Sequence, residues 1–283
     1  MHIVYQGLCY TVPMNIVQAI ILGIVQGVTE FLPISSSAHL LITRRIFALP
    51  ENETYLIFDA ILHLATALVI TAYFFDDIKK IVSPIFSNTY LSEKKKSFKV
   101  LGLIGVASIP AIVIGFTLED YFTESLRGIP VIAVTLVVGA IILIFAEKIA
   151  HKRLLSKQKE QLSWRQAIVV GFFQTLALIP GMSRSGSTLS GGVFMGLSKV
   201  EATKFAFLLG LPVLYGVGGI KLIQSFSTPG VPAVLIISGS IAAIISGYLS
   251  MRVLMYVVRE KTLTYFAGYR IILAALLFFM FVL

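Results

Sequence analysis

Charged residues are scarce in this chain, and their scarcity excludes most soluble folds. Asp, Glu, Lys and Arg make up 13% of the 283 residues, which is about half the share found in a typical soluble domain. Hydrophobic residues make up 57%, and the mean hydropathy is +0.91. Because so few charged side chains cannot cover a water-exposed surface, the composition predicts an integral membrane protein.

Cysteine and acidic residues are also scarce. The single cysteine, Cys9, excludes an internal disulfide and a cluster of thiolate metal ligands. The 14 acidic residues are outnumbered by 23 Lys and Arg, which gives a net charge of +9. The basic residues gather in loops between apolar runs, so orientation in a membrane explains them better than contact with nucleic acid. We therefore expect no nucleic-acid partner.

A polar cluster interrupts the first apolar run, within residues 15–41. Gln26 and Glu30 stand four residues apart, so they share one face of the predicted helix. Pro33 ends that helix, because proline donates no N–H and disfavours a helical residue before it. A carboxylate and an amide are thus expected at the end of an apolar helix.

Three adjacent serines follow the break, namely Ser35, Ser36 and Ser37. Serine is a poor residue for a helix interior and a good N-cap, so a second short helix is predicted to begin here. His39 would then lie in its first turn. The cluster therefore combines hydroxyls, an imidazole and a carboxylate in an apolar segment.

A second stretch, residues 167–192, repeats this pattern. Matching positions pair Ala19, Gly23 and Gln26 with Ala167, Gly171 and Gln174 and, after a gap of one residue, Pro33 and Ser36 with Pro180 and Ser183. The second copy lacks a counterpart of Glu30 and gains Arg184. Broken helices at matching positions of two halves point to a binding site near the middle of the membrane.

The remaining apolar runs predict the membrane architecture. Six are long enough to cross a bilayer, which takes about 20 residues; they lie at about 57–75, 100–118, 129–149, 203–223, 232–251 and 266–283. The arms of the two broken segments, 15–48 and 166–198, are shorter, so we interpret each segment as a re-entrant pair. The prediction is an all-α membrane protein with six transmembrane helices, two re-entrant helix pairs and an inverted-topology repeat. It forms one domain, 1–283, with halves at about 15–150 and 163–283.

The distribution of Lys and Arg predicts the orientation. Segments expected in the cytoplasm are the basic loops at 76–99, 148–165, 198–203 and 252–261. Segments expected outside are 50–56, 119–128, 224–231 and both termini, with residues 1–14 as a short exposed lead. Arg44 and Arg45 depart from the rule. Because each half contains three spans, the second half is inverted relative to the first, and the two re-entrant pairs can meet at mid-depth.

The two helix breaks suit an anionic ligand. A helix N-terminus presents free N–H groups and partial positive charge, and it binds phosphate readily. Gly181 permits close backbone approach, and the planar guanidinium of Arg184 matches phosphate oxygens. An arginine at membrane depth is costly unless it is paired, so we expect Glu30 to pair with Arg184 when phosphate does not. A pair that only stabilises the fold remains the alternative.

Several side chains could do chemistry at such a site. Ser36 is the candidate nucleophile, and Glu30 is either a general base or a ligand of a divalent cation. His39 could accept or relay a proton, or it could be a hydrogen-bonded core residue. Asp59 and His63 form another pair four residues apart, either structural or in the outer shell of the site.

Two motifs carry a resemblance to a known family. The first runs Gln26-Gly-Val-Thr-Glu30-Phe-Leu-Pro33-Ile-Ser35-Ser36-Ser37-Ala-His39, and the second runs Pro180-Gly181-Met182-Ser183-Arg184-Ser185, followed by Thr188. On these motifs the chain resembles the undecaprenyl-diphosphatase family (UppP or BacA) over nearly its whole length. Gln26 is the main departure, because many members carry Glu there, so the resemblance does not extend to a second metal-binding carboxylate at this position.

The resemblance implies a phosphatase of the plasma membrane, multi-pass, whose site opens to the outer face. It would remove the terminal phosphate of a polyprenyl diphosphate lipid, and the monophosphate would be reused in cell-envelope glycan synthesis. It implies catalytic roles for Glu30, Ser36, His39 and Arg184, and a divalent cation, Mg²⁺ or Ca²⁺, held by Glu30. Residues matched to substrate binding are Gln26, Ser35, Ser37, Gly181, Ser183, Ser185 and Thr188. A homodimer stays open.

Two other functions fit parts of the sequence. Inverted repeats with broken helices also occur in transporters, so a secondary transporter or flippase for an anionic or phosphorylated lipid is the main alternative. A non-catalytic lipid-binding protein would leave His39 and Glu30 unexplained. The two motifs and the set of Ser, His, Glu and Arg side chains favour hydrolysis.

Overall fold

The computed structural model describes residues 14–50, 52–87, 90–118, 126, 128–153, 162–227 and 232–281. All regular secondary structure in these ranges is helical. Most of the predicted exposed lead and Cys9 lie outside the described residues, as do 119–125, 127, 154–161 and 228–231. Met14, the described end of the lead, is buried and donates its N–H to the hydroxyl of Tyr55.

Both halves of the chain are helical in their described residues. The helices of the first half are α1 (Ile16–Phe31), α2 (Ser36–Ile46), α3 (Glu53–Tyr73), α4 (Phe75–Phe86), α5 (Leu91–Thr117) and α6 (Ile129–Lys152). Those of the second half are α7 (Trp164–Thr175), a 3₁₀ turn (Leu176–Leu178), α8 (Arg184–Phe194), α9 (Lys199–Ser227), α10 (Ala233–Glu260) and α11 (Thr264–Phe281).

Six of these helices, α3, α5, α6, α9, α10 and α11, are long and apolar enough to cross a membrane. The prediction of six spans is thereby confirmed, and α1 is apolar but shorter. The segment 76–99 was expected as a loop and is instead mostly helical, because α4 and the first turns of α5 lie in it. Asp76 and Asp77 in the first turn of α4 favour that helix by their position at the positive end of its dipole.

The two breaks have the same local structure. Ser35 and Ser183 both have positive φ, 77° and 66°, and each caps the following helix. The Oγ of Ser35 accepts the N–H of Ala38, and that of Ser183 accepts the N–H of Gly186. The predicted alignment, which matched Ser36 to Ser183, is wrong by one residue at this point. With Ser35 matched to Ser183 no gap is needed, and Ser36 corresponds to Arg184.

Helices from the two halves of the chain pack against each other. Asn15 and Ser163 begin α1 and α7 with equivalent capping boxes. α1 packs against α10 and α7 packs against α5, each through a glycine. A Cβ on Gly23 would lie 2.1 Å from the carbonyl oxygen of Gly239, and a Cβ on Gly171 would lie 2.4 Å from that of Ala107. α3 also packs against α9, and α6 against α11.

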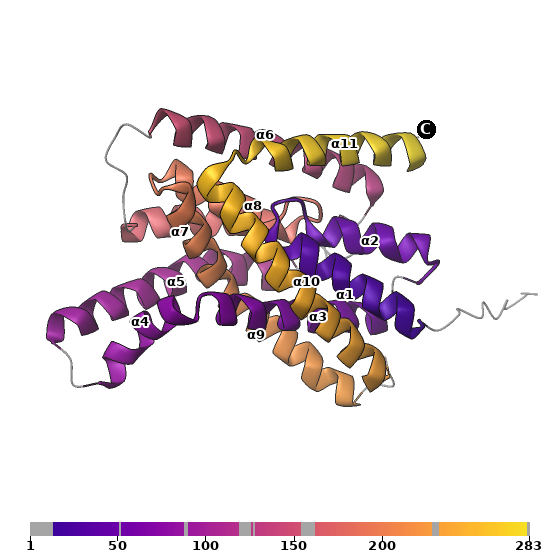
Figure 1. The fold of residues 1–283 in the computed structure, drawn as a ribbon, viewed down its shortest axis with the longest axis horizontal. Helices are drawn as coiled ribbons and strands as arrows, with labels where there is room; N and C mark the ends of the chain where they lie inside the picture. The colour runs from indigo at the N-terminus through magenta and orange to yellow at the C-terminus, as the bar shows by residue number, and fades with distance from the viewer. Residues whose placement is uncertain are drawn as a thin grey trace, which may run out of the picture.

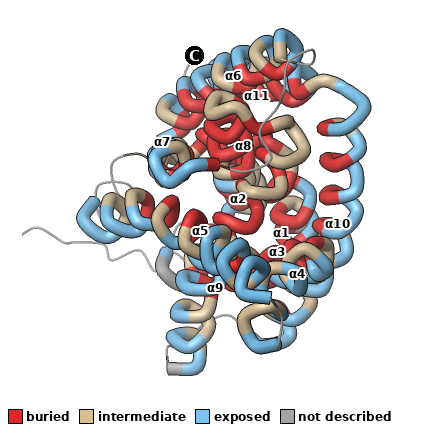
Figure 2. Tube along the Cα trace, turned by 90° about the vertical axis from the view of Figure 1, so that its left-hand side faces the viewer, coloured by how far each residue is buried: buried red, intermediate tan, exposed pale blue. Residues whose placement is uncertain are grey.

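The breaks lie in the interior of this arrangement. In Figure 1, α6 and α11 run side by side along the upper edge, with α8, α1 and α2 below them, and α10 runs diagonally past α1, against which it packs. Figure 2 shows mostly buried residues on α8, at the centre of the molecule. The fold thus brings the polar turns of both halves to its middle.

Candidate functional site

Glu30, in the last turn of α1, joins the two halves of the molecule. Its Oε1 accepts a hydrogen bond of 2.5 Å from Nη2 of Arg184, at the start of α8. Its Oε2 accepts a hydrogen bond of 2.7 Å from Oγ of Ser36, at the start of α2. Glu30 is only 6% exposed, so these charge-assisted bonds lie away from solvent. Three of the four predicted catalytic residues therefore meet.

Gln26 and His63 complete the surroundings of this carboxylate. The Nε2 of Gln26, one turn before Glu30, donates to Oε2 of Glu30 at 3.0 Å and lies 2.8 Å from Nδ1 of His63. That Nδ1 is also 3.2 Å from Oε2 of Glu30. His63 therefore belongs to the site. Asp59, four residues before His63, forms an ion pair with Arg44.

Two polar atoms at this cluster are buried and have no hydrogen-bond partner among the described residues, Nη1 of Arg184 and Oε1 of Gln26. Gly210 on α9 leaves room for the guanidinium, since a Cβ there would lie 2.1 Å from Nη1. A buried donor without a partner is costly. We conclude that Nη1 of Arg184 is available to an oxygen of a bound anion while Nη2 holds Glu30.

The predicted binding hydroxyls mainly connect the two turns. Ser37 Oγ accepts the N–H of Gly181 at 3.4 Å and contacts Ser35 Oγ at 3.1 Å. Ser183 and Ser185 have their hydroxyls 3.2 Å apart, and Ser185 donates to the carbonyl of Leu32 at 3.4 Å. The turn of each half therefore contacts the turn of the other.

Thr188 lies one turn into α8. Its hydroxyl donates to the carbonyl of Arg184 at 2.6 Å, so in this structure it contacts its own helix. Its role in substrate binding stays a prediction, as does that of the serines.

His39 is placed beside the cluster and not in it. Its Nδ1 lies 2.7 Å from the carbonyl of Ser35, and its Nε2 lies 2.7 Å from the hydroxyl of Tyr269 on α11. The two rings stack, with centroids 5.6 Å apart. Both nitrogens are thus engaged away from Ser36 and Glu30, and a proton-transfer role for His39 stays a prediction. No pattern in the sequence indicated the contact between His39 and Tyr269.

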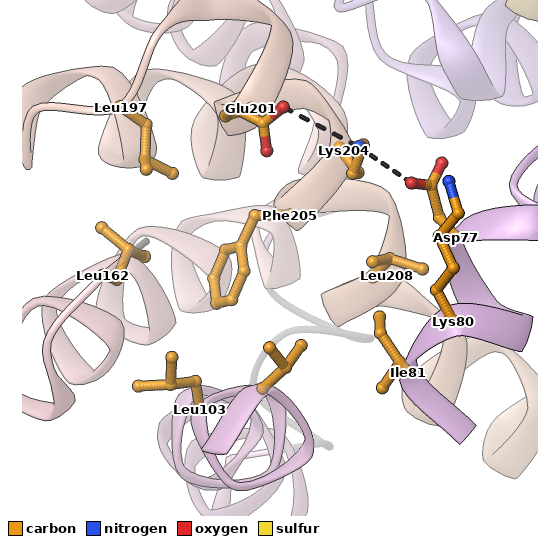
Figure 3. Close-up of a pocket in the computed structure, with 11 residues that line it drawn as sticks. Asp77, Lys80, Ile81, Leu103, Leu162, Leu197, Glu201, Lys204, Phe205 and Leu208 are labelled. Carbon is orange, nitrogen blue, oxygen red and sulfur yellow. Dashed lines mark hydrogen bonds and ion pairs between the residues drawn. The ribbon is translucent and has the colours of Figure 1, made fainter. Parts of the chain in front are cut away.

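A groove of about 540 Å³ runs along α1, α2 and α11 beside His39. Its lining is mostly apolar and includes Thr29, next to Glu30 on α1, and Leu32, the residue after the end of α1. A separate cavity of about 200 Å³ lies between α4, α5 and α9, where Lys204 pairs with Asp77 at 2.9 Å and Glu201 at 3.7 Å (Figure 3). None of the Glu30 cluster lines that cavity.

The oxygen atoms of the cluster fit a hard divalent cation. Among the described residues no group of three or more His, Cys, Asp and Glu side chains could hold a metal ion. Mg²⁺, however, commonly binds through one or two carboxylates together with substrate phosphates. Glu30 provides a carboxylate, and Gln26 next to it has its amide oxygen unpartnered. The predicted cation therefore fits these residues.

Comparison with known proteins shows the family of this chain. The family described as "Bacitracin resistance protein BacA" matches residues 19–276. A Halothermothrix orenii protein named undecaprenyl-diphosphatase is 34% identical over 90% of this chain and 94% of its own length. Proteins of the same name from Corynebacterium efficiens and Methanosphaera stadtmanae are 37% and 36% identical, over 91% and 90% of this chain and 88% and 94% of their own. The chain, a multi-pass membrane protein with six apolar spans, belongs to the BacA family.

Proposed function

We propose that this protein is an undecaprenyl-diphosphatase, a membrane phosphatase that converts a polyprenyl diphosphate into the monophosphate and inorganic phosphate. The observation that carries the proposal is the Glu30 cluster. A serine hydroxyl donates to a buried carboxylate, and the same carboxylate holds an arginine with one free, buried donor. These contacts support the roles proposed for Ser36 as nucleophile, Glu30 as base and Arg184 as anion-binding group. The names of the relatives support the substrate.

The geometry favours attack by Ser36. Its hydroxyl proton already points to Oε2 of Glu30, so Glu30 can accept that proton as Oγ attacks the terminal phosphorus. The new Oγ–P bond forms as the bridging P–O bond breaks, and the bridging oxygen leaves with the prenyl monophosphate. Water then attacks the phosphorus of the phosphoserine and the P–Oγ bond breaks. Glu30 returns its proton to Oγ of Ser36, and the protons of the water leave with the inorganic phosphate.

Stabilising the phosphate charge is the second requirement. Nη1 of Arg184 can bind an equatorial oxygen of the phosphate that is transferred. The helices α2 and α8 begin directly after the two breaks, so their N-terminal N–H groups can also stabilise phosphate charge. Glu30 and the amide oxygen of Gln26 would hold the divalent cation. The cation would supply charge neutralisation for the diphosphate.

The proposed architecture is an inverted repeat with two re-entrant pairs. The equivalent capping boxes, the caps at Ser35 and Ser183, and the reciprocal packing of α1 on α10 and α7 on α5 support it. The basic segment of α4 and α5 would lie in the cytoplasm. The active site would open to the outer face of the plasma membrane, where the monophosphate returns to glycan synthesis.

Phosphate release by the purified protein tests this function directly. We expect release of inorganic phosphate from undecaprenyl diphosphate in detergent, dependent on a divalent cation and abolished by Ser36→Ala. Vesicles containing the protein distinguish the transporter alternative. Movement of labelled lipid across the bilayer without phosphate release, by wild type and Ser36→Ala alike, would contradict the phosphatase.

A further inference from the structure

Arg270, in the membrane-spanning helix α11, is fully buried, with 0% of its surface exposed. Arginine inside a span is expensive and usually marks function or a specific partner. All its hydrogen bonds are to backbone carbonyls: Nε to Leu136 at 3.0 Å, Nη1 to Pro33 and Met182 at 3.2 and 3.1 Å, and Nη2 to Thr135 and Gly181 at 3.1 and 2.8 Å. The five N–H donors of the guanidinium are all used.

These carbonyls belong to three different parts of the chain. Pro33 lies in the turn that breaks the first helix, and Gly181 and Met182 lie in the turn that breaks the second. Thr135 and Leu136 lie on α6. Carbonyls at helix breaks lack helical donors, and at membrane depth each must find another partner. The side chain of Arg270 thus donates to carbonyls of both helix breaks and of α6.

Two glycines shape the space around this guanidinium. A Cβ on Gly139 of α6 would lie 2.0 Å from Nη2 of Arg270 and 2.5 Å from Cζ. Gly181, whose carbonyl receives Nη2, has φ of +95°, a conformation that side chains disfavour. The hydroxyl of Thr135 adds a bond of 2.6 Å to the carbonyl of Pro180. The cavity therefore matches a planar, five-donor group.

We infer that Arg270 is a positioning residue that fixes the two helix-breaking turns relative to each other and so holds Ser36 opposite Arg184. Ser36 follows Pro33 by three residues, and Arg184 follows Met182 by two, so a shift of one turn moves one reacting group against the other. The inference rests on the proposed phosphatase function, because it assigns to Arg270 the alignment of that site. Arg270 itself touches no reacting atom.

Lysine cannot replace this arrangement. Its ammonium has three donors on one atom, whereas the five carbonyl acceptors are bonded by three separate nitrogen atoms of the guanidinium. Arg270→Lys keeps the charge and loses the connection between the turns. Because a small misplacement of reacting groups can cost about a hundredfold in rate, we expect kcat to fall at least about tenfold. We expect KM to change little, since the lipid-binding surfaces remain.

A matched pair of glycine variants tests the same point without changing Arg270. Gly139→Ala crowds the guanidinium, whereas Gly268→Ala, on α11 and with open space at its Cβ, does not. We expect Gly139→Ala to lower kcat as Arg270→Lys does and Gly268→Ala to behave as wild type. Thermal melting and gel filtration in detergent report whether each variant is folded. Unfolding of both Arg270→Lys and Gly139→Ala beside intact Gly268→Ala would overturn positioning in favour of a purely structural role.

A double-mutant cycle of Arg270→Lys with Arg184→Ala distinguishes a positioning role of Arg270 from a non-specific loss of activity. If Arg270 acts by placing Arg184 against Ser36, then Arg270→Lys added to Arg184→Ala should cost less than about twofold more, because the aligned partner is already lost. Losses that multiply, or folded Arg270→Lys protein with wild-type kcat, would overturn the inference. An inactive wild type would instead refute the phosphatase function, so the two failures are distinguishable.

Discussion

Replacing Arg184 by lysine tests how the site holds phosphate. In the structure, Nη2 of Arg184 donates to Glu30, and Nη1 is buried without a partner among the described residues. The planar guanidinium can therefore hold Glu30 and a phosphate oxygen at the same time. A lysine ammonium is a point charge without this fork. Losing one hydrogen bond to a charged group costs about 1.5–3 kcal/mol, which corresponds to about 10- to 150-fold in kcat/KM. We expect Arg184→Lys to lose activity on that scale, close to the loss in Arg184→Ala.

Gly210→Ala displaces the guanidinium of Arg184 without changing Arg184 itself, and we expect it to lower kcat/KM as Arg184→Lys does. The added Cβ would meet Nη1 at 2.1 Å, so the guanidinium must move while its charge stays. Gly216→Ala on the same helix is the matched control, because nothing lies within 4 Å of its Cβ. Initial rates of phosphate release over a range of lipid concentrations give kcat/KM for each variant. Activity of folded Arg184→Lys within twofold of wild type would refute the phosphate-holding role.

Two further predictions concern the cation and the orientation. Gln26→Glu places a second carboxylate beside Glu30 and should lower the cation concentration that gives half-maximal rate; an unchanged titration would mean that position 26 does not face the ion. In a Cys9→Ser background, a single cysteine at position 95 should react with an impermeant thiol reagent only from the cytoplasm, and one at position 228, outside the described residues, only from the other side. Labelling of both from one side would contradict the inverted repeat.

The spans and breaks could be predicted because their signals are local. Run length and hydropathy identify α3, α5, α6, α9, α10 and α11, since a bilayer requires each backbone polar group to be satisfied within the helix. Pro33 and the serines that follow mark the first break in the same way. The helix α4 was missed, because its charged residues were interpreted only as a topology signal.

The core of the site was also visible in the sequence, and its surroundings were not. Glu30, Ser36 and Arg184 belong to two motifs, and their types already indicated a carboxylate, a nucleophile and an anion-binding group. His63 reaches Glu30 from α3, and Tyr269 reaches His39 from α11, through packing that no local pattern encodes. Arg270 did carry a signal, as an arginine in an apolar span, but its five acceptors follow only from the fold.

Turnover of Ser36→Ala tests the central claim most directly, measured beside Ser35→Ala and Ser37→Ala. Ser36 donates to Glu30, whereas Ser35 caps α2 and Ser37 contacts Gly181, so only Ser36→Ala removes the proposed nucleophile. We predict that Ser36→Ala binds the diphosphate lipid with nearly unchanged affinity and releases no phosphate. Retention of more than about a tenth of the wild-type rate, a barrier change below about 1.4 kcal/mol, would contradict attack by Ser36.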